Sequence, residues 1–418
     1  PNTAVALTNA RVITMNDERA VIENATVLIK GNRIESIARG TAVPEDYTEI
    51  DLAGKTIMPG IIDAHAHGPY AGDDIIPQQN WNLLAHLALG VTTVHNPSSS
   101  AKSAFAAAEY ARTDRILGPR IFSTGEIVYG AKSTSWAPID NLDDALAHVR
   151  RLAAQGAISV KNYNQPRREQ RQQVIEAARQ EGLISVAEGG SLYQLDMSMI
   201  ADGITGIEHN VPTLKMYDDV HQFWRQSGAG YTPTLVVTYG GLTSEDYFYQ
   251  NTEVWKHPIL SNFVPPSQLQ ARSVRRVTAP EEDYRDDDSA AAAKILMDAG
   301  IMVNIGAHGQ REGLASHWEM WSFARGGFSP MEALATATIN PARHLGMDKD
   351  IGSLEAGKLA DLVIVDANPL DDIRNTDRIS HVMINGRLYR AGDLSEEVTG
   401  TATLSPFHWQ TTPQGAIR

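Results

Sequence analysis

The sequence of 418 residues contains no cysteine. This absence excludes disulfide bonds and thiolate chemistry, so any bound metal must take its ligands from nitrogen and oxygen atoms. A chain without cysteine fits a reducing or an oxidising compartment. The sequence starts at Pro1 without a charged and then apolar leader. Composition therefore leaves the localisation open between the cytoplasm and, if a leader has been removed, the periplasm or the exterior.

Long apolar runs and excess positive charge are also missing. No apolar run approaches the roughly 18 residues that a membrane span needs. The 36 lysine and arginine residues are outnumbered by 50 aspartate and glutamate residues, which gives a formal net charge of −14. This balance argues against a nucleic acid or an anionic membrane as partner. We expect a small-molecule substrate, no nucleic acid and no membrane.

The stretch 58–67, MPGIIDAHAH, is typical of a metal site. Its proline-glycine pair predicts a turn, and its two isoleucines begin a short apolar run typical of a buried parallel strand. His65 and His67 are two positions apart, so on a strand both imidazoles face the same side and can reach one metal ion. Two histidines in an ordinary turn would give the same pattern, so the rest of the chain must supply further ligands.

Short apolar strands alternate with helical stretches from residue 60 onward. The strands are expected at 61–65, 91–94, 120–124, 157–160, 183–187, 203–207, 231–237 and 301–305, and helices at 142–155, 166–180, 290–299 and from Ser329 onward. Eight alternations predict a (β/α)8 TIM barrel, which places its chemistry at the C-terminal ends of the strands. Six ionisable side chains fall at or just after those ends: His65, His67, Lys161, Glu188, His209 and His308.

Both chain ends are rich in β-branched residues and indicate a second, smaller unit. We expect antiparallel strands in 1–58 to join strands in 352–400 as a composite β-sandwich domain. The barrel would then be a catalytic domain over 59–351. The polar residues 401–418 are interpreted as a C-terminal arm.

The chain resembles the amidohydrolase superfamily in two motifs. The stretch 59–67 is similar to its strand-one metal motif, and 340–346 with 352–363 to its C-terminal signature. More narrowly, the segments 161–165, 187–190, 307–310 and 317–319 resemble the amidohydrolase domain found fused to TolB-like propellers, which is imidazolonepropionase- or prolidase-like. The resemblance implies a hydrolase with one or two divalent metal ions, zinc first, with iron or manganese as alternatives.

The resemblance also implies ligands. Lys161 matches a lysine that family members carry as a metal-bridging carbamate, and His209 matches a family ligand; the alternative for Lys161 is a plain ion pair with Glu188. Two positions depart from the family pattern. Glu188 stands where a histidine is usual, and His308 stands where an aspartate is usual, so His308 is either a ligand or the general base.

The expected function is hydrolysis of a C–N bond, in an amide, a peptide-like compound or a cyclic amide, by a metal-activated hydroxide. Tyr163 and His95 could donate to the developing oxyanion. Packing is the alternative for Tyr163, and a buried structural role is the alternative for His95. A lactone or phosphoester hydrolase, or a non-hydrolytic binding protein with a degenerate site, are the alternative functions.

The long segment 239–288 follows the seventh expected strand and contains several aromatic residues. It could form a lid over the site or a contact in a homo-oligomer, or its aromatic residues could simply pack the segment itself.

Overall fold

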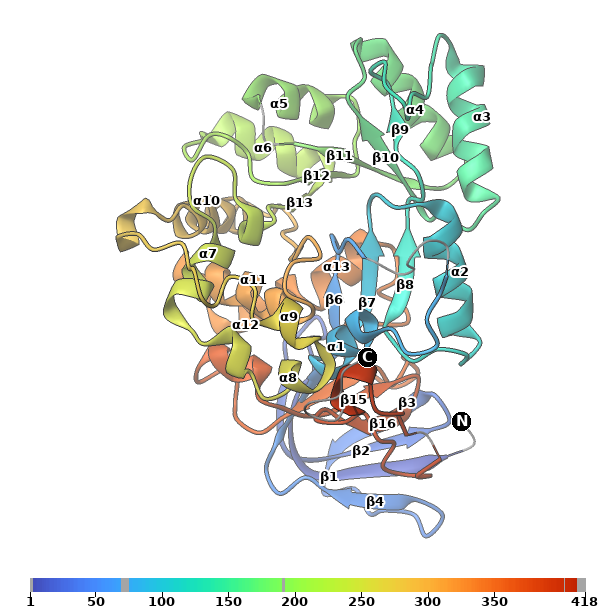
Figure 1. Cartoon of the computed structure of the whole chain (residues 1–418), viewed down its shortest axis with the longest axis vertical. Coiled ribbons are helices and arrows are strands. Elements are labelled where there is room, and N and C mark those ends of the chain that lie inside the picture. Colours follow the sequence, from blue (N-terminus) through green and yellow to red (C-terminus); the bar gives the residue numbers. More distant parts are fainter. Residues whose placement is uncertain (1–2, 69–74, 190–191, 402, 412–418) are drawn as a thin grey trace, which may run out of the picture.

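Strands from both chain ends form one sheet in the computed structural model, which describes residues 3–68, 75–189, 192–401 and 403–411. The sheet has eight strands in the order β16-β15-β14-β5-β1-β2-β3, with β4 paired to β1. Figure 1 shows these blue and red strands together below the rest of the molecule. Their bounds are Ala4–Ile13 (β1), Val21–Lys30 (β2), Arg33–Arg39 (β3), Thr48–Asp51 (β4), Thr56–Pro59 (β5), Leu362–Val365 (β14), Ile379–Ile384 (β15) and Arg387–Arg390 (β16).

The terminal sheet differs from the expected sandwich in two ways. Ladder pairing runs without a break from β16 to β3, so a second layer, and hence a sandwich, is not confirmed. β1 also pairs in parallel with β4 and β5, whereas only antiparallel pairs were expected. The union of the two chain ends is made by β5, which pairs antiparallel with β14 from Pro59↔Leu362 to Thr56↔Val365.

The middle of the chain forms two parallel sheets. One has the order β6-β7-β8 and the other β13-β12-β11-β10-β9. Their bounds are Ile61–Asp63 (β6), Val91–Asn96 (β7), Arg120–Ser123 (β8), Val128–Tyr129 (β9), Ser159–Tyr163 (β10), Ile184–Glu188 (β11), Gly206–Glu208 (β12) and Gly230–Thr232 (β13). Each strand is followed by polar residues at its C-terminal end, as the sequence predicted, and these ends position the site described below.

The last two expected strands are shorter than predicted. Thr234 adopts a left-handed conformation (φ 50°), and residues Leu235–Val237 continue as a 3-10 turn (η1), so β13 stops at Thr232. In the expected eighth strand only Val303 forms a bridge, to Tyr231. A single backbone hydrogen bond, from Ala64 N to Ile305 O at 3.3 Å, links this stretch to the residue that follows β6. Within the described residues the ladders do not close a barrel.

Helices alternate with these strands. Their bounds are Trp81–Ala88 (α1), Ala101–Arg112 (α2), Leu142–Ala153 (α3), Arg168–Gln180 (α4), Tyr193–Ala201 (α5), Asp218–Ser227 (α6), Asp286–Asp298 (α10), Leu314–Arg325 (α11), Pro330–Thr336 (α12) and Ile339–His344 (α13). The predicted caps are present: the Asn141 side chain accepts from Asp144 N, and Ser329 forms a capping box with Glu332. α4 begins at Arg168, two residues after the expected Pro166.

The segment 239–288 has its own secondary structure and its own packing. It contains Ser244–Asn251 (α7), Val254–Lys256 (η2), Leu260–Phe263 (α8), Pro266–Leu269 (α9) and Glu281–Asp283 (η3). Phe248 and Phe263 are buried, and Phe248 stacks on Trp318 of α11 with ring centroids 5.4 Å apart. Phe248 and Tyr249 therefore pack the segment against Trp318 of α11, and the lid and the oligomer contact stay predictions.

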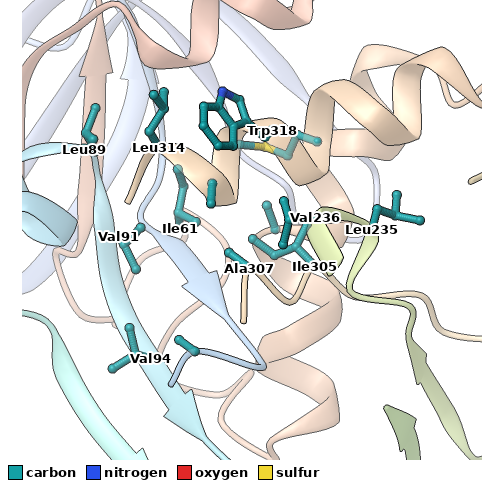
Figure 2. Close-up of a cluster of buried hydrophobic side chains, with 14 of the residues drawn as sticks. Ile61, Leu89, Val91, Val94, Leu235, Val236, Ile305, Ala307, Leu314 and Trp318 are labelled. Atoms are coloured by element: carbon teal, nitrogen blue, oxygen red, sulfur yellow. The ribbon is translucent and has the colours of Figure 1, made fainter. Parts of the chain in front are cut away.

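α11 supports the core beneath the strand ends. Figure 2 shows Trp318 and Leu314 of this helix above Ile61 of β6, with Val236 and Ile305 beside them. All five side chains are buried. The described part of the arm ends in a short helix, His408–Thr411 (α14), and residues 402 and 412–418 of the expected arm lie outside the described residues. None of the described helices is long and apolar enough to cross a membrane.

Candidate metal centre

Four histidines converge at the C-terminal ends of the parallel strands. The His65 ring centroid lies 4.9 Å from that of His67, 5.0 Å from that of His209 and 5.1 Å from that of His308. One nitrogen from each of His65, His67 and His308 lies within 4.8 Å of the others. His65 and His209 are buried, whereas His67 and His308 are partly exposed. The cluster therefore has a closed side and a side that solvent can reach.

Glu188 links the histidines to Lys161. Its Oε2 lies 2.8 Å from Lys161 Nζ, and its Oε1 lies 2.9 Å from His209 Nε2. Lys161 is 2% exposed, so this cation is removed from water. Burial raises the pKa of Glu188, but the close approach of His209 and of the charged Lys161 outweighs burial, and the net pKa lies below its usual range. Glu188 is thus an anion at the centre of the site.

A second set of side chains orients the imidazoles. Glu208 is hydrogen-bonded to His65 Nδ1, Asn96 Oδ1 lies 3.0 Å from His67 Nδ1, and Thr234 Oγ1 lies 2.7 Å from His209 Nδ1. Partners of this kind fix ring orientation in metal sites and leave the other nitrogen free for a ligand bond. None of these three residues was predicted from the sequence to have a role in the site, although Glu208 and Asn96 lie directly beside His209 and His95 at the predicted strand ends.

Two further buried carboxylates hold the backbone around the cluster. Asp63 accepts hydrogen bonds from His65 N and Ala307 N, both at 3.1 Å, and from Ser316 Oγ at 2.9 Å. Glu319 of α11 accepts from Val236 N at 2.7 Å and Gly306 N at 3.4 Å. Burial raises the pKa of Glu319 to about 8 and also raises that of Asp63, against these hydrogen bonds. The loop that presents His308 is therefore tied to β6 and α11, and the turn that carries Thr234, the partner of His209, is tied to α11.

Burial keeps the imidazoles of His65, His67 and His308 neutral by lowering their pKa values. It is the main cause that lowers the pKa of His65 well below its usual value, and it lowers that of His308 to about 3 with help from the charges of His67 and His209. Neutral imidazole is the form that binds a metal ion.

Tyr163 and His95 are the two remaining candidates from the sequence. The ring of Tyr163 lies 5.8 Å from Lys161 Nζ. His95 uses both ring nitrogens within the fold, against Ala64 O at 2.9 Å and Ser159 Oγ at 2.7 Å, and is 1% exposed. We therefore do not carry His95 forward as an oxyanion donor, because its geometry matches the structural alternative.

Tyr239 was not singled out by the sequence analysis. Its hydroxyl donates to Glu188 Oε1 at 3.0 Å, and its ring stacks on His209 at 4.9 Å with an interplanar angle of 25°. Its position just after the shortened seventh strand is the signal that could have identified it.

The donor set fits a divalent ion. His65 Nε2 and His67 Nε2 face each other at 3.2 Å. His209 Nε2 is buried, and it lies near Glu188 Oε1 but outside hydrogen-bonding geometry. Nitrogens that point at one another and at a carboxylate leave lone pairs for which a cation is the natural partner. Imidazole and carboxylate ligands suit zinc, iron and manganese.

Comparison with known proteins agrees with this geometry. The sequence pattern of the Amidohydrolase family matches residues 56–389. A 5-methylthioadenosine/S-adenosylhomocysteine deaminase of Bacillus cereus (strain 03BB102) is 23% identical over 423 residues, which cover 91% of this chain and 92% of the relative. The structure of a Xaa-Pro dipeptidase with bound methionine in the active site is similar with a TM-score of 0.70, at 21% identity, over 93% of this chain and 100% of that chain. A putative prolidase from Bifidobacterium longum is similar with a TM-score of 0.68, at 23% identity, over 92% of this chain and 94% of that one.

An α/β fold with histidines gathered at parallel strand ends defines a metallo-dependent hydrolase. The chain belongs to the Amidohydrolase family, whose pattern covers most of its length. It is a hydrolase that acts on carbon–nitrogen bonds.

Proposed function

We propose that this hydrolase cleaves the C–N bond of an amide, a peptide-like compound or a cyclic amide in a metal-dependent reaction. The observation that carries the proposal is the convergence of His65, His67, His209 and His308 at the strand ends, with Glu188 beside His209. In this proposal His65, His67, Glu188, His209 and His308 hold one or two divalent ions, with zinc first, and a carbamate on Lys161 completes the set. A bound ion supplies polarisation of the scissile carbonyl and activation of water.

The partly exposed residues make contact with the substrate. His308 is open to solvent on one side and lies against three other imidazoles, so it can complete the ligand set or accept a proton beside it. Tyr163 lies next to Lys161, where its phenol can donate to the oxygen of the scissile carbonyl. Glu208, Asn96 and Thr234 hold the rings in place while the substrate enters.

The fold supports the same proposal. We infer that the two parallel sheets and residues 301–305 make one (β/α)8 barrel over 59–351. Backbone hydrogen bonds link Ser123 O to Ile158 N at 3.4 Å and Met302 O to Tyr231 N at 2.8 Å, in addition to the bond between Ala64 and Ile305. The terminal sheet would be a separate domain from 1–58 and 352–400. A homo-oligomer remains a prediction.

Metal analysis of the purified protein tests the proposed function. We expect one or two equivalents of a divalent metal and hydrolysis of simple N-acyl amides. His65→Ala should lose both metal and activity and keep the far-ultraviolet circular dichroism of the wild type. A chain that binds no stoichiometric metal and cleaves no amide would instead support the degenerate binding protein.

The role of His308 and the bond that is cleaved are separate questions. In His308→Asn, retained metal with lost turnover would make His308 the base, and lost metal would make it a ligand. Parallel assays with lactones and phosphoesters distinguish the alternative hydrolase class, which predicts faster turnover of those esters than of amides. Activity that rises with added bicarbonate would support the carbamate on Lys161.

A further inference from the structure

Aromatic side chains from two separate loops border the ion pair of Lys161 and Glu188. Tyr163 ends β10 and lies beside Lys161, and Tyr239 follows the turn after β13 and lies beside Glu188. The charges of Glu188 and of Tyr163 both act on the pKa of Tyr239, so the two phenols are close enough to interact. One phenol therefore lies beside each partner of the ion pair at the proposed reacting centre.

Each of these rings packs against another ring and keeps part of its surface exposed to solvent. One face of Tyr239 stacks on His209, yet the residue is 40% exposed, so the rest of its surface meets solvent. Tyr163 is partly exposed, and its ring packs on that of Tyr129 with centroids 5.3 Å apart. Tyr129 in turn accepts a hydrogen bond from Asn164 and pairs through its backbone with Trp136. Rings supported in this way present fixed flat surfaces, which stack well on a flat partner.

From this arrangement we propose that Tyr129, Tyr163 and Tyr239 form an aromatic slot that selects substrates with a flat group, such as a benzoyl group or a planar heterocycle, next to the scissile bond. This inference rests on the proposed function, because it assigns the substrate class of the same site. Within it Tyr239 is a specificity-determining residue, since its ring touches the substrate and its hydroxyl touches Glu188.

Binding of two unreactive probes of equal size tests the slot. Benzamide is flat and cyclohexanecarboxamide is puckered, and both are neutral. We expect the wild-type protein to bind benzamide about five- to tenfold more tightly by titration calorimetry, because only the flat ring can stack. Equal affinity for the two amides would overturn the proposal.

Three variants test which residues cause the preference for benzamide. Tyr239→Phe keeps the ring and should keep the preference for benzamide, whereas Tyr239→Leu should reduce it to less than twofold. Tyr129→Leu removes the ring behind Tyr163 and should also reduce the preference, which provides a second reading if Tyr239→Leu does not fold. Tyr110→Leu is the matched control, because Tyr110 is 37% exposed on α2 and takes no part in the slot. A preference unchanged in Tyr239→Leu and Tyr129→Leu would show that other residues select the flat ring.

The same protein samples separate this inference from the proposed function. Amide hydrolysis with bound metal but no preference for flat probes would refute the slot alone. Absence of both metal and hydrolysis would refute the proposed function, even if benzamide still bound.

Discussion

Gly306 lies where the loop after residues 301–305 passes directly over β6. A Cβ at this position would lie 2.7 Å from the Cβ of His65 and 2.6 Å from Thr232 Cγ2. Both distances are shorter than real Cβ contacts, and both neighbours are buried, so neither can move away at low cost. The absence of a side chain at Gly306 is what lets His65 and the loop of His308 approach each other.

Replacement of this glycine should therefore disturb the metal centre. We expect Gly306→Ala to lower the stoichiometry of bound metal by at least half and to cost about 1–3 kcal/mol of unfolding free energy through overpacking. Metal analysis and urea denaturation measure the two effects. Gly392→Ala is the control, because a Cβ there meets nothing within 4 Å. Full metal content in Gly306→Ala would show that the loop can shift without displacing His65.

The six residues that converge at the site could be predicted from the sequence, whereas the side chains that hydrogen-bond to them could not. His65, His67, Lys161, Glu188, His209 and His308 were found because each falls at or just after a strand end, and the structure brings all six together. Glu208, Thr234 and Tyr239 were not assigned. Their roles depend on which side chain faces which across neighbouring strands, and that information is absent from spacing along one strand.

At the scale of the elements, α11 supports the site through the buried side chain of Glu319. Glu319 is fully buried, and its two oxygens accept from the backbone of two different loops, at Val236 and Gly306. Glutamine can offer only one carbonyl oxygen, and its amide group would face a second donor. A buried donor left without a partner costs about 1–3 kcal/mol.

We expect Glu319→Gln to lose about that much stability. We also expect it to bind metal more weakly, because Val236 lies in the same turn as Thr234, which contacts His209, and Gly306 lies in the loop that carries His308. Glu396→Gln provides a matched control: Glu396 is also buried and also accepts from two backbone amides, those of Val398 and Thr399, but it lies near the terminal sheet. The control should lose stability and keep its metal affinity. Equal metal affinity in both variants would limit Glu319 to a structural role.

α13 carries a histidine that makes stability depend on pH. His344 packs against Gly206 and Gly230, and burial lowers its pKa from 6.5 to about 4. The unfolded chain therefore binds the proton first as the pH falls, so the folded state should lose stability between pH 6.5 and pH 4, by at most about 1.4 kcal/mol per pH unit from this group. Unfolding free energies of the wild type and of His344→Asn at several pH values test this. The difference between the two curves should be level above pH 6.5 and slope below it; parallel curves would contradict the assignment.

Helices and strands could be predicted from the sequence where residues close together in the chain determine them. Pairing between distant strands could not be predicted in this way. The cap at Asn141 and the capping box at Ser329 are local and were found. The stretch 301–305 is apolar like a strand, but whether it pairs depends on the neighbouring strand, which Thr234 interrupts after Thr232. The single terminal sheet depends likewise on pairing between distant segments, which apolar periodicity alone does not specify.

At the scale of the whole molecule, one ion pair joins the parallel sheets to the terminal sheet. Arg120 of β8 donates to both oxygens of Asp361, at 2.9 and 3.2 Å, and Asp361 also accepts from Asn385 N at 2.7 Å. The Asp361 side chain is only 3% exposed. Removal of the guanidinium would leave this carboxylate buried without a counter-charge.

We expect Arg120→Met to lose about 2–3 kcal/mol of unfolding free energy, because methionine keeps the apolar stem but not the charge. Arg112→Met removes an exposed arginine paired with Glu109 and should leave stability unchanged within error. Urea denaturation of the two variants measures the contrast. A loss of similar size in both would show that the junction contributes no more than a surface pair.

The pairing of β5 with β14 sets an order of events during synthesis on the ribosome. The two strands are separated by about 300 residues, so the outer edge of β5 has no partner until nearly the whole chain has been made. An open apolar strand edge invites pairing with other chains. Any shortened form that ends before β14 would keep that edge exposed, so the terminal strands have to be retained together, or removed together, when residues 59–351 are produced alone.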